Sequence, residues 1–117
     1  MILYKKYFFD GAHYMPNFPK GHRYREIHGH SYEMVIHLEG KIIENQGWIT
    51  DFDKIDKIVH SIINIIDHKL LNDIEGLGIP TSENIAIWFW NKLKPDLPNI
   101  QKIEINRPRI GGCIYSG

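Results

Sequence analysis

Two histidines separated by one glycine, His28 and His30, form the segment of this 117-residue chain whose residue types and spacing best suit a chemical site. Residues two apart on a β-strand project from the same face, so both imidazoles can reach one ion. A segment this short also recurs by chance, and an ordinary polar pair explains it at least as well as a ligand pair. A metal site therefore requires a third ligand.

His13 is the candidate for that third ligand. It ends the segment FFDGAH, in which Gly11 and Ala12 leave room for close approach. If the strands on either side of residues 14–27 pair as a hairpin, His13 lies beside His28. Three neutral imidazoles around Zn²⁺ leave a fourth coordination position open, which is typical of catalytic zinc sites. The alternative is three unrelated polar residues, and the residues alone leave both interpretations open.

The elements that must position these histidines can be assigned from periodicity. Residues 2–13 are aromatic and rich in strand formers, and residues 30–39 alternate between apolar and polar positions, so both are predicted strands. Residues 14–27 contain prolines and a glycine and are predicted to form a loop. The later elements are two predicted helices and two predicted strands, at residues 51–68, 80–93, 100–106 and 111–117. This order predicts a single α+β domain over residues 1–117, with a four-stranded antiparallel sheet and two helices on one face.

Three of the predicted elements have residues that share one face at the expected spacing. In the second strand this face consists of His30, Tyr32, Met34, Ile36 and Leu38. In the helices it consists of Ile55, Ile58, Val59, Ile62 and Ile66, and of Ile85, Trp88 and Phe89. Thr81 is the predicted N-cap of the second helix. His37 and His60 fall on the polar sides and are expected at the surface, outside the site. The two edges of such a sheet are normally covered or paired, so we expect self-association.

The composition excludes several classes of function. The 14 basic and 14 acidic side chains cancel, which predicts no basic face for nucleic acid or an anionic membrane. The single cysteine, Cys113, rules out a cysteine-based zinc cluster, so a metal would need imidazole or carboxylate ligands. The first apolar stretch contains two lysines and no small-residue cleavage site, and no apolar run reaches the length of about 18 residues that a membrane span needs. We therefore expect a cytoplasmic protein.

Six ordered segments carry a family resemblance: FDGAH, HGHSYEMVIHLEG, GWITDF, IDHKLLN, PTSENIA and GGCIY. In order and approximate spacing they resemble the 6-pyruvoyl-tetrahydropterin synthase family, which includes 6-carboxy-tetrahydropterin synthase of the queuosine pathway. The resemblance implies the tunnelling fold, in which trimers close a continuous β-barrel and usually stack into hexamers with sites between subunits. It also implies that His13, His28 and His30 are ligands of Zn²⁺.

The resemblance assigns further roles. Asp67 and His68 match a family pair that transfers protons, in which the carboxylate orients and charges the imidazole. The alternative is a histidine at a helix C-terminus that interacts with the helix dipole. Substrate contacts are expected from Thr81, Ser82, His22 and Arg107.

Tyr24 departs from the family pattern. Relatives usually have a catalytic cysteine four residues before the first histidine of the HGH segment, and this chain has Tyr24 there. A phenol has an ordinary pKa of about 10, against about 8.5 for a thiol, and is the poorer base at neutral pH. Glu26 or His22 of the same loop can replace the thiol. Cys113 is not at the motif position and is expected in the core.

Arg107 is a second departure, because it stands where the family has a glutamate that binds the pterin ring. A guanidinium can only donate hydrogen bonds, so the usual pairing with the ring is reversed. Arg107 suits an anionic or carbonyl-rich ligand. It is a surface arginine instead if the alignment slips near Pro108.

Three functions are compatible with these residues. The first is a zinc-dependent lyase that acts on 7,8-dihydroneopterin triphosphate or a related compound. The second is a zinc enzyme of the same fold with another small anionic substrate, and the third is a non-catalytic homologue that binds pterin or metal. The Asp67–His68 pair favours an enzyme, which we expect to be a trimer or hexamer with a small-molecule substrate and no nucleic-acid or membrane partner.

Overall fold

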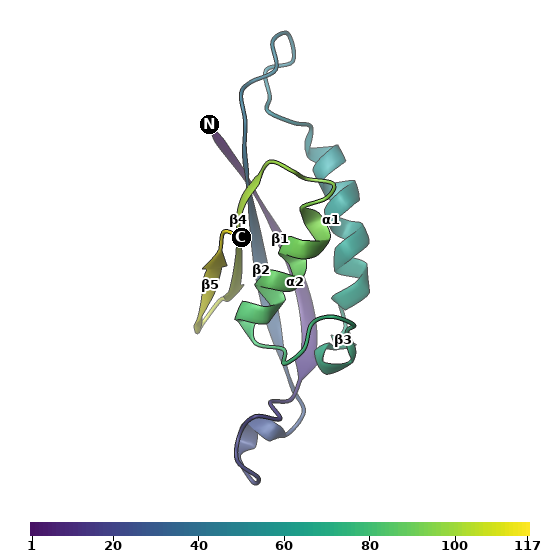
Figure 1. The fold of residues 1–117 in the computed structure, drawn as a ribbon, viewed down its shortest axis with the longest axis vertical. Helices are drawn as coiled ribbons and strands as arrows, with labels where there is room; N and C mark the ends of the chain where they lie inside the picture. Colours follow the sequence, from purple (N-terminus) through teal and green to yellow (C-terminus); the bar gives the residue numbers. More distant parts are fainter.

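The computed structural model describes residues 1–117, with two α-helices and a five-stranded sheet (Figure 1). The strands are β1 (Ile2–His13), β2 (His28–Glu39), β3 (Lys69–Leu70), β4 (Ile100–Arg107) and β5 (Gly111–Tyr115). The helices are α1 (Phe52–Ile66) and α2 (Ser82–Leu93), and two short 3₁₀ turns are η1 (Arg23–Arg25) and η2 (Leu71–Asp73). The predicted α+β class is confirmed. No helix has both the length and the apolar character that crossing a membrane requires.

A long hairpin of β1 and β2 is the frame of the molecule. The two strands pair antiparallel along their whole length, from Ile2 opposite Glu39 to His13 opposite His28. Alternate residues of each strand are buried on the same face, as the period of two predicts. β2 begins at His28, two residues before the predicted start, so both histidines of the HGH segment belong to the strand.

The strand order is β3-β1-β2-β4-β5, and the prediction of a purely antiparallel four-stranded sheet was incomplete. The four predicted strands do pair antiparallel, but β3 adds a fifth strand that runs parallel to β1 beside Gly11 and Ala12. A strand of two residues, Lys69 and Leu70, is too short to show an alternating pattern, and for that reason the periodicity did not reveal it. Barrel closure between several chains stays a prediction.

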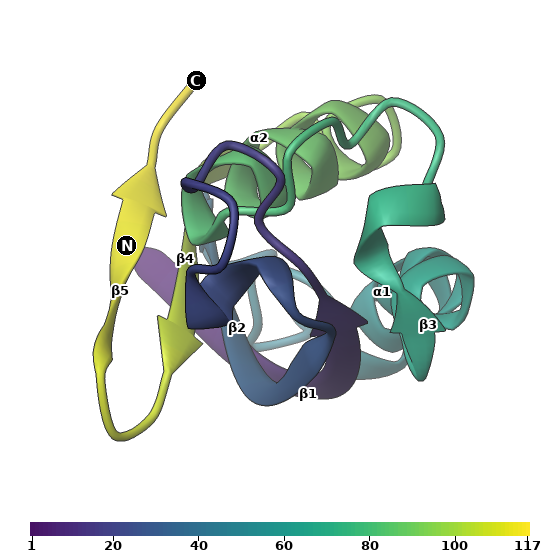
Figure 2. The ribbon, with the colours of Figure 1, turned by 90° about the horizontal axis from the view of Figure 1, so that it is seen from below.

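Both helices pack against the same face of the sheet. One apolar core joins residues of β1, β2 and β4 to residues of α1 and α2, and Figure 2 shows the two helices on one side of the curved sheet. α1 buries Ile55, Val59 and Ile66 as predicted. Ile58 and Ile62 were also expected on the buried face but are only partly buried, whereas Ile63 is buried. In α2, Ile85, Trp88 and Phe89 are buried as predicted.

The cap of α2 was also predicted correctly. The Thr81 hydroxyl accepts a hydrogen bond from the backbone N–H of Asn84 at 3.2 Å, which satisfies one of the free donors of the first turn. Pro80, the residue before the cap, holds the start of α2 next to the end of β1, because its carbonyl accepts a hydrogen bond from the ring of His13. The helix start therefore faces the loop end of the hairpin.

The molecule is elongated, with extents of 60 × 23 × 22 Å. Residues 14–27, which join β1 to β2, form one tip, at the bottom of Figure 1, and the segment that follows β2 forms the other. The histidines at the paired ends of β1 and β2 thus lie near the first tip, between the loop and the start of α2.

Candidate metal and substrate site

The structure brings His13, His28 and His30 together at the end of the β1–β2 hairpin. His13 is opposite His28 in the strand register, and their Nε2 atoms are 2.9 Å apart. The ring centroid of His30 lies 4.9 Å from that of His13 and 5.1 Å from that of His28. One nitrogen from each ring lies within 4.8 Å of the others, a spacing that one metal ion can bridge.

Backbone carbonyls fix the orientation of two of these rings. Nδ1–H of His13 donates to the Pro80 carbonyl at 2.9 Å, and Nδ1–H of His28 donates to the Glu26 carbonyl at 2.8 Å. The Nε2 atom of each neutral ring therefore carries a lone pair. Carbonyl partners of this kind are typical of the outer shell of metal-binding histidines.

In the third ring, that of His30, a contact with a side chain identifies the nitrogen that accepts hydrogen bonds. Nη1 of Arg107 lies 3.5 Å from Nε2 of His30, and because a guanidinium can only donate, this Nε2 atom is an acceptor. Each of the three rings thus has one acceptor nitrogen. The 2.9 Å separation between the His13 and His28 acceptors is repulsive unless a proton or a cation lies between them. The donor set fits a metal ion that takes neutral imidazole ligands.

The pKa values favour the neutral rings that a metal needs. Burial lowers the pKa of His13, the hydrogen bond to the Pro80 carbonyl opposes this shift, and the proximity of His28 and Arg107 adds to the lowering. Burial, the charge of His13 and the charge of Arg107 lower the pKa of His30 to about 4. Near neutral pH both imidazoles are uncharged, so metal binding does not require a proton to be expelled.

The loop of residues 14–27 holds Tyr24 beside the histidines. The Tyr24 N–H donates to Nδ1 of His22 at 3.1 Å, and its carbonyl accepts from the Met15 N–H at 2.7 Å. Arg25 fastens the loop by donating to the carbonyls of Pro16 at 3.2 Å and Phe18 at 2.9 Å. The ring centroids of Tyr24 and His28 are 6.1 Å apart.

The phenol of Tyr24 is influenced by nearby arginines. Nη2 of Arg23 donates to the Tyr24 hydroxyl at 3.4 Å. This hydrogen bond and the charge of Arg23 lower the pKa of Tyr24, and the more distant charge of Arg107 acts in the same direction. The shift moves the phenol towards the range in which it can exchange protons near neutral pH.

A cavity of about 620 Å³ opens beside the three histidines. Of the residues predicted for the site, the ones that line it are His13, His28, His30, Tyr24, Thr81, Ser82 and Arg107. His22 and Glu26 do not line it, although His22 supports Tyr24 and the Glu26 carbonyl supports His28. Arg107 is therefore not a free surface arginine.

Three further cavity residues were missed by sequence reasoning: Arg23, Glu83 and Cys113. Glu83 lies in the first turn of α2, and neither it nor Arg23 was assigned a role in the site. Cys113 was expected in the core, but it is half-buried and lines the cavity. Its pairing with Ile105 across the last hairpin puts it on the helix-facing side of the sheet, and this register was the available signal. Burial and the charge of Glu83 raise the pKa of its thiol.

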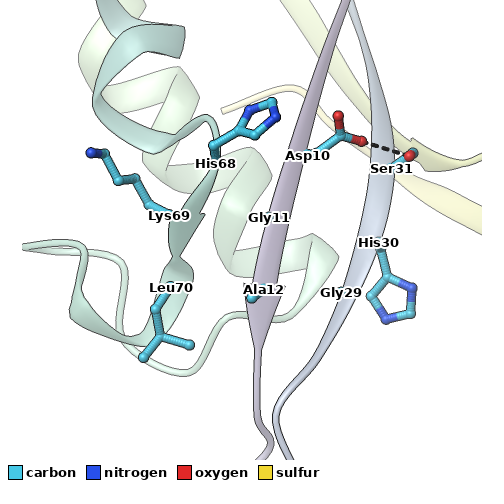
Figure 3. Close-up of a pocket in the computed structure, with 9 residues that line it drawn as sticks. All are labelled: Asp10, Gly11, Ala12, Gly29, His30, Ser31, His68, Lys69 and Leu70. Carbon is cyan, nitrogen blue, oxygen red and sulfur yellow. Dashed lines mark hydrogen bonds between the residues drawn. The ribbon is translucent and has the colours of Figure 1, made fainter.

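Asp67 and His68 lie outside this cavity. His68 lines a second hollow of about 530 Å³ together with Asp10 and Ser31, which alternate along the strands with the residues that face the helices (Figure 3). Nδ1 of His68 lies 2.9 Å from Oδ1 of Asp67. The Asp10 N–H donates to the same oxygen at 2.9 Å, and this hydrogen bond is the main cause of the lowered pKa of Asp67. His30 also lines this hollow, but its ring nitrogen groups with those of His13 and His28, whereas Asp67 and His68 group with Asp10.

His68 is held in an unusual backbone conformation. Its φ of 58° is left-handed, and its N–H donates to the Asp10 carbonyl at 2.7 Å. The Ser31 hydroxyl donates to Asp10 Oδ1 at 2.6 Å, the contact drawn in Figure 3. The contact with Asp67 orients the ring and the backbone hydrogen bond holds the residue, which is a more specific arrangement than the alternative of a helix-dipole interaction.

The other two histidines behave differently from each other. His60 is exposed, as predicted. His37 was also expected at the surface but is only partly exposed, because its Nε2 atom lies 2.7 Å from Oε1 of Glu104 on the neighbouring strand. Neither lines the cavity beside the three ligand candidates.

Comparison with known proteins gives a consistent result. Residues 2–117 match the family described as 6-pyruvoyl tetrahydropterin synthase. The chain is 34% identical over 103 residues to dihydroneopterin monophosphate aldolase of Pyrococcus furiosus, and the match covers 88% of this chain and 82% of that protein. It is 31% identical over 110 residues to 6-carboxy-5,6,7,8-tetrahydropterin synthase of Synechocystis, covering 89% and 84%. The structure of 6-pyruvoyl tetrahydropterin synthase from Caenorhabditis elegans superposes with a TM-score of 0.89 at 22% identity, covering 100% of this chain and 95% of that one.

Proposed function

The chain belongs to the 6-pyruvoyl tetrahydropterin synthase family, and from this premise we propose that it is a zinc-dependent lyase acting on the side chain of a phosphate ester of 7,8-dihydroneopterin. The family supports an enzyme that acts on a dihydroneopterin-related substrate. The observation that carries the proposal is the convergence of three imidazole acceptors on one side of a cavity, two of them oriented by backbone carbonyls.

His13, His28 and His30 are the proposed zinc ligands. These three imidazoles would hold the ion and leave access for the substrate from the cavity. When bound, zinc supplies Lewis-acid polarisation of the substrate hydroxyl oxygens, so that they lose protons near neutral pH. The protein keeps the ligands neutral and aimed, through the Pro80 and Glu26 carbonyls.

Among lyase reactions, cleavage of the side-chain carbon–carbon bond fits the residues best. The electrons of the broken bond pass to the C6=N5 imine of the dihydropterin, and the carbon atom next to the ring then takes a proton. This retro-aldol reaction starts with removal of a hydroxyl proton, which is easier than removal of a proton from carbon. It yields 6-hydroxymethyl-7,8-dihydropterin and glycolaldehyde phosphate from the monophosphate. Tyr24, whose hydroxyl is near Arg23, is the proposed acid–base group.

The second candidate is the synthase reaction on 7,8-dihydroneopterin triphosphate, in which triphosphate is eliminated. The retained Asp67–His68 pair favours it, since proton shuffling at carbon needs a relay. The absence of a thiol at Tyr24 disfavours it, and Glu26 lies outside the cavity. In both reactions we propose that Asp67 and His68 act at a cavity of another chain in a trimer or hexamer, because in their own chain they group with Asp10 and do not line the cavity beside the three histidines.

The two reactions release different products, and one assay separates them. Zinc-loaded protein is incubated with 7,8-dihydroneopterin monophosphate and, separately, with the triphosphate, alone and with acetaldehyde. Release of glycolaldehyde phosphate and 6-hydroxymethyl-7,8-dihydropterin supports the aldolase reaction. Release of inorganic triphosphate supports the synthase reaction. Chelated protein and His13→Ala serve as controls that should be inactive. Pterin binding without turnover indicates a binding protein, and the absence of both contradicts the proposal.

A further inference from the structure

The charge of Arg107 has no partner within the chain. Its Nε atom is buried and makes no hydrogen bond, and its nearest polar contact is the neutral His30 ring, 3.5 Å from Nη1. The ion pairs of the structure join other residues: Lys5 with Asp56, Lys6 with Glu33, His37 with Glu104 and His68 with Asp67. A partly buried guanidinium without a carboxylate is costly, so this position suits an anion that arrives from outside.

Arg23 adds a second cation to the same cavity. It also lacks a carboxylate partner, and it donates only to the neutral Tyr24 hydroxyl. The one carboxylate of the cavity, Glu83, makes no ion pair with either arginine. Two guanidinium groups against one carboxylate leave the cavity positive even without a metal ion.

A second unpartnered donor lies on the neighbouring strand. The Tyr32 hydroxyl is buried without a hydrogen bond, and the Tyr32 side chain is 1% exposed. Glu33 pairs with Asn106, so Tyr32 and Arg107 occupy the next positions of β2 and β4 on the face that packs against the helices. The only two unpartnered buried side-chain polar atoms of the chain, the Tyr32 hydroxyl and Arg107 Nε, thus belong to adjacent positions.

We propose that Arg107 and Arg23 form an oxyanion subsite beside the three histidines and that this subsite binds the phosphate group of the substrate. The identity of the phosphate rests on the proposed function, whereas the anion subsite itself does not. A guanidinium offers a planar pair of N–H donors that matches phosphate oxygens. In a dihydroneopterin phosphate the ester lies only a few bonds from the side-chain hydroxyl groups. A cation in contact with His30 is therefore placed to hold the phosphate while those hydroxyl groups face the histidines.

Arg107 then acts as a specificity-determining residue. It favours substrates that carry a phosphate on the side chain and gives no comparable advantage to the unphosphorylated compound. Because ring recognition by a carboxylate at position 107 is absent, binding energy at this position comes from the anion. The subsite therefore separates this chain from family members that have a glutamate there.

The first test measures phosphate binding without a reaction. Full-length protein, chelated and zinc-loaded, is titrated with inorganic phosphate and, separately, with acetate, by calorimetry. Arg107→Gln should weaken phosphate binding at least tenfold in the chelated protein, while Arg107→Lys should retain part of it. The matched control is Arg109→Gln, an exposed arginine in the adjacent turn, which should bind like the wild type. Equal phosphate binding by Arg107→Gln and Arg109→Gln would overturn the subsite, and equal binding of acetate and phosphate would overturn the phosphate assignment.

The second test separates this inference from the proposed function. Zinc content and circular dichroism first establish that Arg107→Gln is folded and metal-loaded. Turnover is then compared for 7,8-dihydroneopterin monophosphate and for unphosphorylated 7,8-dihydroneopterin. Arg107→Gln should raise KM for the monophosphate at least tenfold and leave KM for the unphosphorylated compound within twofold. An equal rise for both contradicts the subsite. Failure of all turnover refutes the lyase but leaves the phosphate titration to decide the subsite.

Discussion

The Nε2 atoms of His13 and His28 lie 2.9 Å apart at the last pair of the β1–β2 register, and each ring donates its Nδ1–H to a backbone carbonyl. The two carbonyls come from different regions, Pro80 before α2 and Glu26 in the loop. The pairing of β1 with β2 brings the rings of His13 and His28 together. The loop and the residue before α2 determine which nitrogen of each ring carries the proton. Metal affinity should therefore depend on residues beyond the ligands themselves.

Loss of a ligand should abolish tight zinc binding. His13→Ala and His30→Ala are each expected to weaken zinc affinity by a factor of about 100 or more, because two imidazoles cannot complete the site. The measurement is zinc content after dialysis against a competing chelator. His60→Ala, which alters an exposed histidine of α1, should keep full zinc content. Zinc retention by the His13 variant would contradict the ligand assignment.

Asn72 should position His13 from outside the cavity. Its side-chain oxygen accepts from the Tyr14 N–H at 3.0 Å, and its amide donates to the Tyr14 carbonyl at 2.9 Å. Asn72→Ala leaves both backbone groups without partners and is expected to lower the free energy of unfolding by about 1–3 kcal/mol. Zinc affinity should fall severalfold. Denaturant unfolding and zinc titration check this, with the exposed Asn64→Ala as a control that should show neither loss.

The metal-free protein should lose stability as the pH falls. The pKa of His30 is about 4 in the folded chain, because of burial and the charges of His13 and Arg107, against about 6.5 when unfolded. Between these values the unfolded chain binds more protons, so the free energy of unfolding decreases as pH drops from about 6.5 towards 4. The lowered pKa of His13 acts with the same sign.

Denaturant unfolding of chelated protein at several pH values measures this slope. His30→Gln should flatten it, because the substituted side chain does not titrate. NMR titration of the chelated wild type should show the His30 ring still neutral at pH 5.5. Protonation of that ring near pH 6.5 would show the assignment to be wrong.

Asp56 should stabilise the contact between α1 and β1. Its Oδ1 atom accepts from the Tyr7 hydroxyl at 2.7 Å and forms an ion pair with Lys5. Tyr7 is 5% exposed, so Asp56→Ala leaves its hydroxyl buried without an acceptor and should lower the free energy of unfolding by about 1–3 kcal/mol. Adding Tyr7→Phe should recover part of this loss in a double-mutant cycle. Zinc content should not change, and additive losses would argue against the contact.

Tyr24 should control the reaction and leave the metal in place. Tyr24→Phe removes the hydroxyl and is expected to lower kcat by a factor of about 100 or more with unchanged zinc content. Tyr24→Cys combined with Arg107→Glu restores the family residues and should raise triphosphate release from 7,8-dihydroneopterin triphosphate. Product analysis by chromatography checks both variants. A normal kcat for Tyr24→Phe excludes the phenol as the acid–base group.

Periodicity predicted most of the fold because most elements bury one clear face. The alternation in residues 30–39 and the apolar stripe predicted within residues 80–93 correspond to β2 and α2. The prediction failed where tertiary packing, rather than the local residue pattern, determines which residues form a strand or are buried. Lys69 and Leu70 become a strand only because Gly11 and Ala12 lie beside them, and α1 buries Ile63 more deeply than Ile58.

The site was predicted as far as strand geometry and the family segments reach. The spacing of His28 and His30 and the hairpin position of His13 depend on local geometry, and the structure brings them together. The positions of Arg23 and Cys113 depend on the loop path and on the register of the last hairpin, which residue patterns do not specify. The family segments gave roles for Asp67 and His68, but not the face of the sheet on which they lie.

The proposed zinc ligands reside on paired strands, whereas Tyr24 and Arg23 reside on the loop of residues 14–27, which Arg25 holds together by its hydrogen bonds to Pro16 and Phe18. Chimeras that import this loop from a relative would thus alter chemical outcome while sparing ion capture. Divergence among such enzymes needs only the exchange of one terminal loop on an otherwise constant scaffold.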